Sequence, residues 1–158
     1  MGADLYIMSI FESNHGQYEP AFAELVEQRN QLREAGKYLQ AEQAQEQIEQ
    51  LHDRMYEAGY FRDSYNDSNL LWLFGISYWQ DIRDMLNKRS ELEPEQAKTL
   101  LKRLSRRERI FEARLQEQSV LESWTKEERE TYFRKKYAEF RRFLQQAIDL
   151  NEAIYCSI

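Results

Sequence analysis

Glycine and proline are scarce in this chain, and their scarcity limits how many sharp turns it can make. Among 158 residues, five are Gly and two are Pro. Because these two residue types end helices and separate short strands, a chain with so few of them favours long helices. Apolar residues also recur at steps of three and four, the period of an amphipathic helix. We therefore predict an all-α fold. It is a single domain over residues 1–158, a bundle of about five helices with a short extended N-terminal segment packed on it.

The bounds of the predicted helices follow from prolines, glycines and capping residues. These signals are Pro20, Gly36, Gly59, Pro94 and the pair Thr125 and Glu128, which has the spacing of a capping box. The helices predicted from them span residues 20–35, 38–58, 68–88, 94–116 and 125–154. The turn between the first two is short enough to predict an antiparallel helical hairpin. The third is apolar nearly all round and is expected in the middle of the bundle, with Gly75 marking a kink or a close helix contact.

The first apolar stretch, residues 4–11, is too short for a helix and is predicted to be an extended segment or a strand. Its most β-prone potential partner is the other end of the chain, residues 154–158. We therefore expect the two ends to pack on the domain.

The location of the protein is suggested by its cysteine content and its N-terminus. Cys156 is the one cysteine, so an intrachain disulfide is impossible, as is typical of a reducing compartment. The first residues lack the basic region of a secretory signal, and Asp4 comes early. The longest apolar run, Leu70 to Ile76, is shorter than a membrane span. We expect a cytoplasmic protein without a membrane partner.

Charge is unevenly distributed along the chain, whose formal net charge is −6. Residues 1–60 carry four basic and eleven acidic side chains, whereas residues 101–158 carry thirteen basic and ten acidic ones. Either acidic and basic helices pack beside one another, or one of these surfaces binds a partner.

One polar segment, residues 59–69, directly precedes the most apolar part of the chain. Its candidate binding residues are Arg62, Asp63, Tyr65, Asn66 and Asn69. Polar groups beside a core must be hydrogen-bonded, because leaving them unsatisfied costs about 1–3 kcal/mol each. The segment is therefore either an internal brace or a preorganised binding site. As a brace, it would cap the next helix through Asn66, Asp67 or Ser68 and pair Arg62 with a carboxylate of the same loop.

The sequence words MGADLYI, AGYFRDSYNDSNLLW and SYWQD cover the N-terminus and residues 58–81. In these words the chain resembles a group of small, uncharacterised bacterial and phage-associated proteins that share the GYFRDSYN motif. The resemblance implies no activity. It implies that Asp4, Arg62, Asp63, Tyr65 and Asn66 are the side chains to test.

Catalytic and metal-binding patterns are weak, so we expect no metal and no cofactor. Two Glu-x-x-His pairs, Glu12–His15 and Glu49–His52, match half of a di-iron bundle motif. The first pair lies in a loop-like segment, which could not present both ligands along a helix. This argues against a di-iron site. Cys156 has an apolar context without a basic neighbour and is expected to be buried filler rather than a nucleophile.

A basic stretch makes nucleic-acid binding an alternative function. The residues concerned are Lys98, Lys102, Arg103, Arg106 and Arg109. Glu108 and Glu112 interrupt the stretch, and its basic face carries no aromatic residue for stacking on bases. Arg107 falls on the apolar side, where we expect it to be partly buried against a carboxylate.

The leading functional hypothesis is a non-enzymatic protein-interaction module of a regulatory, inhibitory or immunity type. Its predicted surface is the segment 62–69 with its neighbours, or the acidic face of the first two helices. One alternative is nucleic-acid association through residues 98–114. Another is an enzyme with a small polar site at residues 62–69, in which Asp63, Tyr65 and His52 would converge. The same amphipathic helices could also form a homodimer.

Overall fold

The computed structural model describes residues 2–64, 69–117 and 124–158. The chain divides into two compact units, where the sequence predicts one domain. The hairpin unit is Met8–Tyr60, and the sheet unit is Met1–Ile7 together with Phe61–Ile158. Among the described residues, none of the helices has both the length and the apolar character that crossing a bilayer requires.

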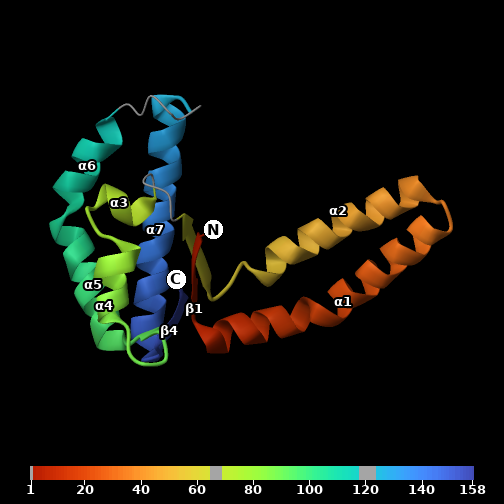
Figure 1. Ribbon diagram of the computed structural model, residues 1–158, viewed down its shortest axis with the longest axis horizontal. Helices are drawn as coiled ribbons and strands as arrows, with labels where there is room; N and C mark the ends of the chain where they lie inside the picture. Colours follow the sequence, from red (N-terminus) through yellow and green to blue (C-terminus); the bar gives the residue numbers. More distant parts are fainter. Residues whose placement is uncertain (1, 65–68, 118–123) are drawn as a thin grey trace. The chain divides into compact units, whose positions relative to one another are not determined.

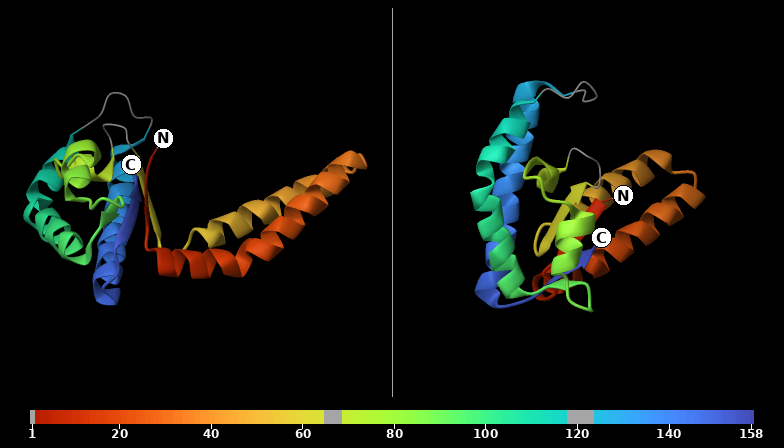
Figure 2. Two further views of the ribbon diagram at one scale, coloured as in Figure 1. Left: turned by 60° about the horizontal axis from the view of Figure 1, so that its bottom comes forward. Right: turned by 60° about the vertical axis from the view of Figure 1, so that its left-hand side comes forward.

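The hairpin unit consists of helices α1 (Met8–Glu34) and α2 (Tyr38–Met55), joined by a turn at Gly36. The views of Figures 1 and 2 show the two helices side by side. Arg29 donates to the side chain of Gln45 at 2.7 Å, and Asn14 donates to the carbonyl of Arg54 at 2.8 Å. Contacts between the middles of both helices and between the start of one and the end of the other confirm the predicted antiparallel hairpin.

The predicted start of the first helix at Pro20 is wrong, because α1 begins at Met8 and Pro20 lies inside it. The extended N-terminal segment is correspondingly shorter than predicted. Residues 12–16 look polar and loop-like in sequence, but their helical form is supported by contacts with the end of α2. Asn14 bonds carbonyls there, and the rings of Phe11 and His15 lie 5.5 and 6.2 Å from that of Tyr56. These are tertiary contacts, which local sequence does not display.

The sheet unit contains a four-stranded sheet, so the all-α prediction is wrong and the fold is mostly helical with a sheet. Its strands are β1 (Gly2–Tyr6), β2 (Tyr60–Ser64), β3 (Glu91–Leu92) and β4 (Ile154–Ser157), in the order β2-β1-β4-β3. β4 pairs antiparallel with β1 and with β3. The predicted pairing of the two chain ends is therefore confirmed, with Leu5 opposite Cys156. Strands of two to five residues are too short to show a clear alternation in sequence.

The remaining helices also differ from the predicted ones. They are α3 (Leu70–Leu73), the π-helical turn η1 (Tyr78–Ile82), α4 (Arg83–Met85), α5 (Pro94–Arg106), α6 (Glu108–Gln116) and α7 (Lys126–Leu150). The predicted helix 68–88 is broken at Gly75, whose φ of +66° no right-handed helix can contain. The predicted helix 94–116 is broken at Arg107, and the predicted helix 38–58 ends early at Met55.

The predicted capping box of the last helix is confirmed. Thr125 accepts a hydrogen bond from the Glu128 amide, and the Glu128 side chain accepts one from the Thr125 amide. The helix ends at Leu150 rather than at residue 154. Asn151 follows in a left-handed conformation, with φ of 50°, and the chain then enters β4.

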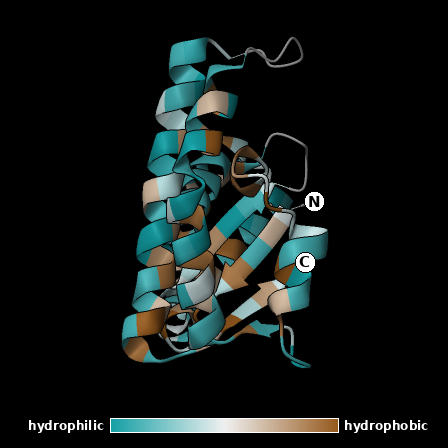
Figure 3. Cartoon of the chain, turned by 90° about the vertical axis from the view of Figure 1, so that its left-hand side faces the viewer, coloured by the Kyte–Doolittle hydropathy of each residue, from teal (hydrophilic) through white to brown (hydrophobic). Residues whose placement is uncertain are grey.

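The core of the sheet unit lies between the sheet and its helices. Phe61 of β2 stacks on Phe140 of α7 with ring centroids 4.6 Å apart, and Phe74 stacks on Phe111 of α6 at the same distance. Apolar residues are brown on much of the sheet, whereas the helices are largely teal on their outer surfaces (Figure 3). Burial of these large side chains supplies most of the stabilising free energy.

Candidate functional site

The predicted polar segment 59–69 is only partly described. Arg62 and Asp63 lie on β2, and Asn69 directly precedes α3. Tyr65 and Asn66 lie outside the described residues, as do the predicted caps Asp67 and Ser68.

Asp63 acts as a brace inside the sheet unit. Its side chain is 2% exposed, and its carboxylate accepts hydrogen bonds from four donors. These are the amides of Ser64 at 2.9 Å, Leu70 at 3.1 Å and Leu71 at 3.4 Å, and the hydroxyl of Tyr78 at 2.9 Å. The carboxylate thus joins β2 to the start of α3 and to η1. With both oxygens bonded inside the protein, Asp63 has little capacity left for a ligand.

Burial also sets the ionisation of Asp63. Removal from water raises the pKa of its carboxyl above the ordinary value of 3.8, although the hydrogen bonds from Leu70, Tyr78 and Ser64 act in the opposite direction. The raised pKa reflects how much water this group has lost.

Three further predicted site residues also have structural partners. Arg62 pairs with Asp4 across the neighbouring strands β2 and β1, with Nε 3.7 Å from Oδ1. The predicted partner was a carboxylate of the loop, whereas the observed one, Asp4, comes from β1. Asn69 caps α3, because its Oδ1 accepts a hydrogen bond from the amide of Trp72 at 2.7 Å. Among the described residues, none accepts a hydrogen bond from its side-chain amide group.

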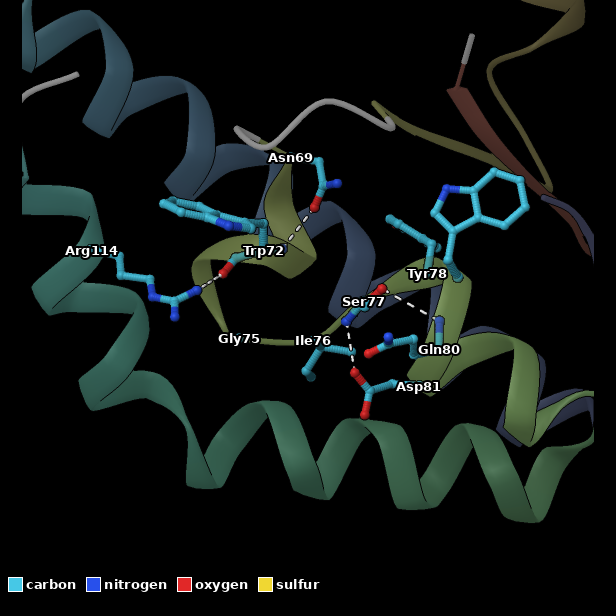
Figure 4. A pocket seen from close by; sticks show the side chains of 10 residues that line it. Asn69, Trp72, Gly75, Ile76, Ser77, Tyr78, Gln80, Asp81 and Arg114 are labelled. Atoms are coloured by element: carbon cyan, nitrogen blue, oxygen red, sulfur yellow. Dashed lines mark hydrogen bonds between the residues drawn. The ribbon is translucent and has the colours of Figure 1, made fainter. Parts of the chain in front are cut away.

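A pocket of about 350 Å³ opens beside Asn69, between α3, η1 and α6 (Figure 4). We call it the tryptophan pocket. Its lining residues are Asn69, Trp72, Gly75, Ile76, Ser77, Tyr78, Trp79, Gln80, Asp81 and Arg114. Trp72 and Trp79 are 36% and 55% exposed, although the sequence places both in a helix expected to be buried. Trp72 precedes the break at Gly75, and Trp79 follows it on η1.

Arg114 forms one border of the tryptophan pocket. Its guanidinium lies 4.7 Å from the ring centroid of Trp72, and it donates a hydrogen bond to the carbonyl of the same residue. Figure 4 shows the Arg114 side chain reaching from α6 toward Trp72. The contact fixes the indole and keeps a positive charge at the border.

The opposite part of the pocket is held by Asp81. Its carboxylate accepts from the Ser77 amide at 2.8 Å and from Arg103 at 2.6 Å. Burial disfavours the charged form of Asp81, but these two hydrogen bonds outweigh it and hold the pKa below the usual value. Ser77 Oγ accepts from the Gln80 amide at 3.4 Å, so the serine hydroxyl proton can still be donated.

Arg107 is half-buried as predicted, and its positive charge helps to lower the pKa of the Asp81 carboxyl. Its guanidinium donates to the carbonyls of Phe74 and Gly75 at 3.2 and 2.9 Å. The break at Gly75 frees backbone carbonyls that a continuous helix would have satisfied internally. Arg107 therefore stabilises the bend beside the pocket.

The predicted basic face is partly used within the protein. Lys98 pairs with Glu95 at 2.6 Å, and Arg103 pairs with Asp81. Lys102, Arg106 and Arg109 are exposed, and no ion pair between described residues is seen for them. The predicted face is thus reduced to these three cations.

The histidine pairs lie on helices. Glu12 and His15 are in α1, so the loop argument against a di-iron site is wrong, and Glu49 and His52 are in α2. His52 lies over Tyr56, with ring centroids 4.7 Å apart. Within residues 2–64, 69–117 and 124–158, no three His, Cys, Asp or Glu side chains are placed to hold one metal ion.

The residues of the enzymatic alternative belong to both units and to the segment outside the described residues. Its Asp63 is fully bonded, its Tyr65 lies outside the described residues, and His52 belongs to the hairpin unit. Cys156 is buried in β4, and burial raises the pKa of its thiol to about 12, which suppresses the reactive thiolate.

No protein-family model, curated protein or solved structure matches this chain. Inference about function therefore depends on the chain's own residues.

The tryptophan pocket is the feature that the sequence analysis missed. The sequence analysis placed Trp72 and Trp79 in a helix expected to be buried and did not single out Arg114. The local signal was Gly75 followed closely by Ser77, which indicates a helix end and a new cap.

Proposed function

We propose that this protein is a non-enzymatic interaction module of a regulatory, inhibitory or immunity type, and that it binds another protein through the tryptophan pocket. The observation that carries the proposal is the pair of exposed indoles, Trp72 and Trp79, at one hollow with Arg114 on its border. Tryptophan and arginine dominate the binding energy of protein interfaces, and a fixed indole loses little entropy when it binds.

The chemistry of the pocket fits an extended segment of the partner. An apolar side chain of that segment would pack on the exposed indoles. Its backbone would bond the Asn69 amide group, the Ser77 hydroxyl and the Gln80 side chain, which lie around the same hollow. Bonds to backbone atoms give affinity, and the indoles select the side chain.

The test compares capture of a partner by the wild type and by the double variant Trp72→Ala/Trp79→Ala. Tagged proteins are incubated with nuclease-treated host lysate, and the captured protein is then purified and titrated. We expect the double variant to lose affinity by about a hundredfold, in the range of a two-residue hot spot.

The third tryptophan provides the control. Trp124 is also exposed but packs against Tyr132 with ring centroids 4.8 Å apart and does not line the pocket. Trp124→Ala should retain capture, and thermal melts must show both variants folded. Equal binding by the wild type and the folded double variant would remove the pocket from the proposal.

Nucleic-acid association is a second candidate function. It is supported by the exposed Arg106 and Arg109 and by a hollow beside Leu101 that is also lined by Arg141 and Arg142 of α7. Binding of a labelled single-stranded oligonucleotide should then weaken steeply with salt and be lost in Arg141→Glu/Arg142→Glu. Absence of binding at low salt would exclude this candidate.

A further inference from the structure

Helix α1 carries an apolar stripe that is only partly covered. It has 27 residues, yet none of them is fully buried. By contrast, α2 buries four side chains, Ala41, Ala44, Ile48 and Met55. Two helices that pack on each other bury one face each, and stable helical bundles usually contain more than two helices.

A groove of about 540 Å³ runs along α1. Its lining residues are Glu19, Phe22, Ala23, Val26, Glu27, Asn30, Gln31 and Glu34. Phe22 and Val26 are half-buried and Ala23 is exposed, so the floor is apolar and reachable from solvent. The groove lies within one helix of the hairpin unit and needs no other element to form.

Carboxylates follow this groove at regular intervals. Glu19, Glu27 and Glu34 line the groove at separations of eight and seven residues, and Glu12 lies seven residues before Glu19, beyond the groove lining. These spacings place all four on one side of α1, about two turns apart. All four are exposed, and no salt bridge between described residues involves them. The groove therefore presents a row of negative charges beside an apolar floor.

We propose that this groove binds a basic amphipathic helix of another protein. A helix lying along α1 would place apolar residues on Phe22, Ala23 and Val26, and lysines or arginines two turns apart opposite the glutamates. Apolar seams flanked by complementary charges are how paired helices select each other. A second copy of α1 would bring glutamates against glutamates, so like-charge repulsion disfavours self-association here. This inference shares with the proposed function the idea that the chain binds proteins. It concerns a different surface, so it does not depend on the tryptophan pocket.

The experiment titrates the full chain with a labelled 27-residue peptide, the length of α1, that has leucine at a and d and lysine at e and g of each heptad. Fluorescence anisotropy reports the affinity. The groove variant is Glu19→Gln/Glu27→Gln/Glu34→Gln, which removes three charges at nearly constant size. The matched control is Glu24→Gln/Glu42→Gln/Glu46→Gln, which removes three exposed carboxylates of the same hairpin outside the groove.

We expect the peptide to bind the wild type and the control alike. The groove variant should bind it about tenfold more weakly or worse, and a peptide with glutamate in place of lysine should not bind. Trp72→Ala/Trp79→Ala should leave this affinity unchanged, so failure here is distinguishable from failure of the tryptophan pocket. Equal weakening in the control variant, or absence of peptide binding, would overturn the proposal. So would a dimer in sedimentation that Val26→Asp dissociates, since a second copy would then occupy the groove.

Discussion

Asp63 concentrates four donors on one buried carboxylate, and this defines its role at the scale of a single residue. Asp63→Asn replaces one carboxylate oxygen by an amide NH2 group. That group is a donor, and it would face groups of the protein that are donors too. We expect the free energy of unfolding to fall by about 1–3 kcal/mol. Tryptophan fluorescence in urea measures it, because all three tryptophans lie in the sheet unit.

The pH dependence of the same variant tests the ionisation of Asp63. The folded pKa is raised above 3.8, so near and above that pH the folded protein holds its proton more tightly than the unfolded chain does. Stability from this group is therefore fully present at lower pH and declines as pH rises through the folded pKa. The advantage of wild type over Asp63→Asn should shrink with rising pH, as measured by urea denaturation at a series of pH values. An advantage that grows with pH would mean that the donors dominate and the pKa is lowered.

Two glycines should respond oppositely to the same substitution. Gly75 has a φ of +66°, and an added Cβ would lie 3.2 Å from Arg107 Nη1, whereas Gly16 lies inside α1 with nothing within 4 Å of the added atom. We expect Gly75→Ala to destabilise by about 1–2 kcal/mol and Gly16→Ala to stabilise by about 0.5–1 kcal/mol. Urea denaturation followed by far-UV circular dichroism measures both. Two changes of the same sign would contradict the assigned conformations.

Residue-level signals were readable from sequence where they act locally. Thr125 and Glu128 form the predicted capping box because its two hydrogen bonds span three residues of chain. The hydrogen bonds that Asp63 accepts from Leu70 and Tyr78 could not be predicted from the sequence, because they depend on how α3 and η1 pack beside β2. The sequence therefore indicated a brace or a site without deciding between them.

At the scale of elements, the two prolines make the clearest comparison. Pro94 occupies the first turn of α5, where a missing N–H costs nothing, but Pro20 lies within α1. Pro20→Ala should stabilise the hairpin unit by about 1–3 kcal/mol, because residue 20 regains an N–H for the carbonyl of Gly16. Pro94→Ala, the matched control, should change stability by less than about 0.5 kcal/mol. Circular dichroism in urea measures both. An unstable Pro20→Ala variant would show that α1 requires the proline.

Helix breaks explain most errors in the predicted elements. Hydrophobic spacing alone continues through Gly75 and Arg107, and both positions interrupt a helix in the structure. The predicted helix 68–88 is interrupted at Gly75 because that residue has a left-handed backbone. Arg107 lies in a turn, and its guanidinium donates hydrogen bonds to the carbonyls of Phe74 and Gly75, which the break at Gly75 leaves without helical partners. The tryptophan pocket follows from the two breaks together.

At the scale of the whole chain, β4 connects the C-terminus to both β1 and β3. Ile154 is fully buried opposite Leu92, whereas its neighbour Tyr155 is 40% exposed opposite Tyr6. Ile154→Ala should destabilise the sheet unit by about 2–5 kcal/mol, and Tyr155→Ala by less than about 1 kcal/mol. Tryptophan fluorescence in urea separates them. Similar losses for both would show that β4 does not alternate between core and solvent.

The sequence by itself determined the helical hairpin, the capped start of α7 and the pairing of the chain ends. These depend on signals within a few residues or on the few β-prone segments available. Tertiary structure decided the division into two units, the four-stranded sheet and the bend at Gly75 between Trp72 and Trp79. The physical reason is that short strands and bent helices are stabilised by partners distant in sequence, such as Arg107 and Asp63, and local periodicity carries no record of those partners.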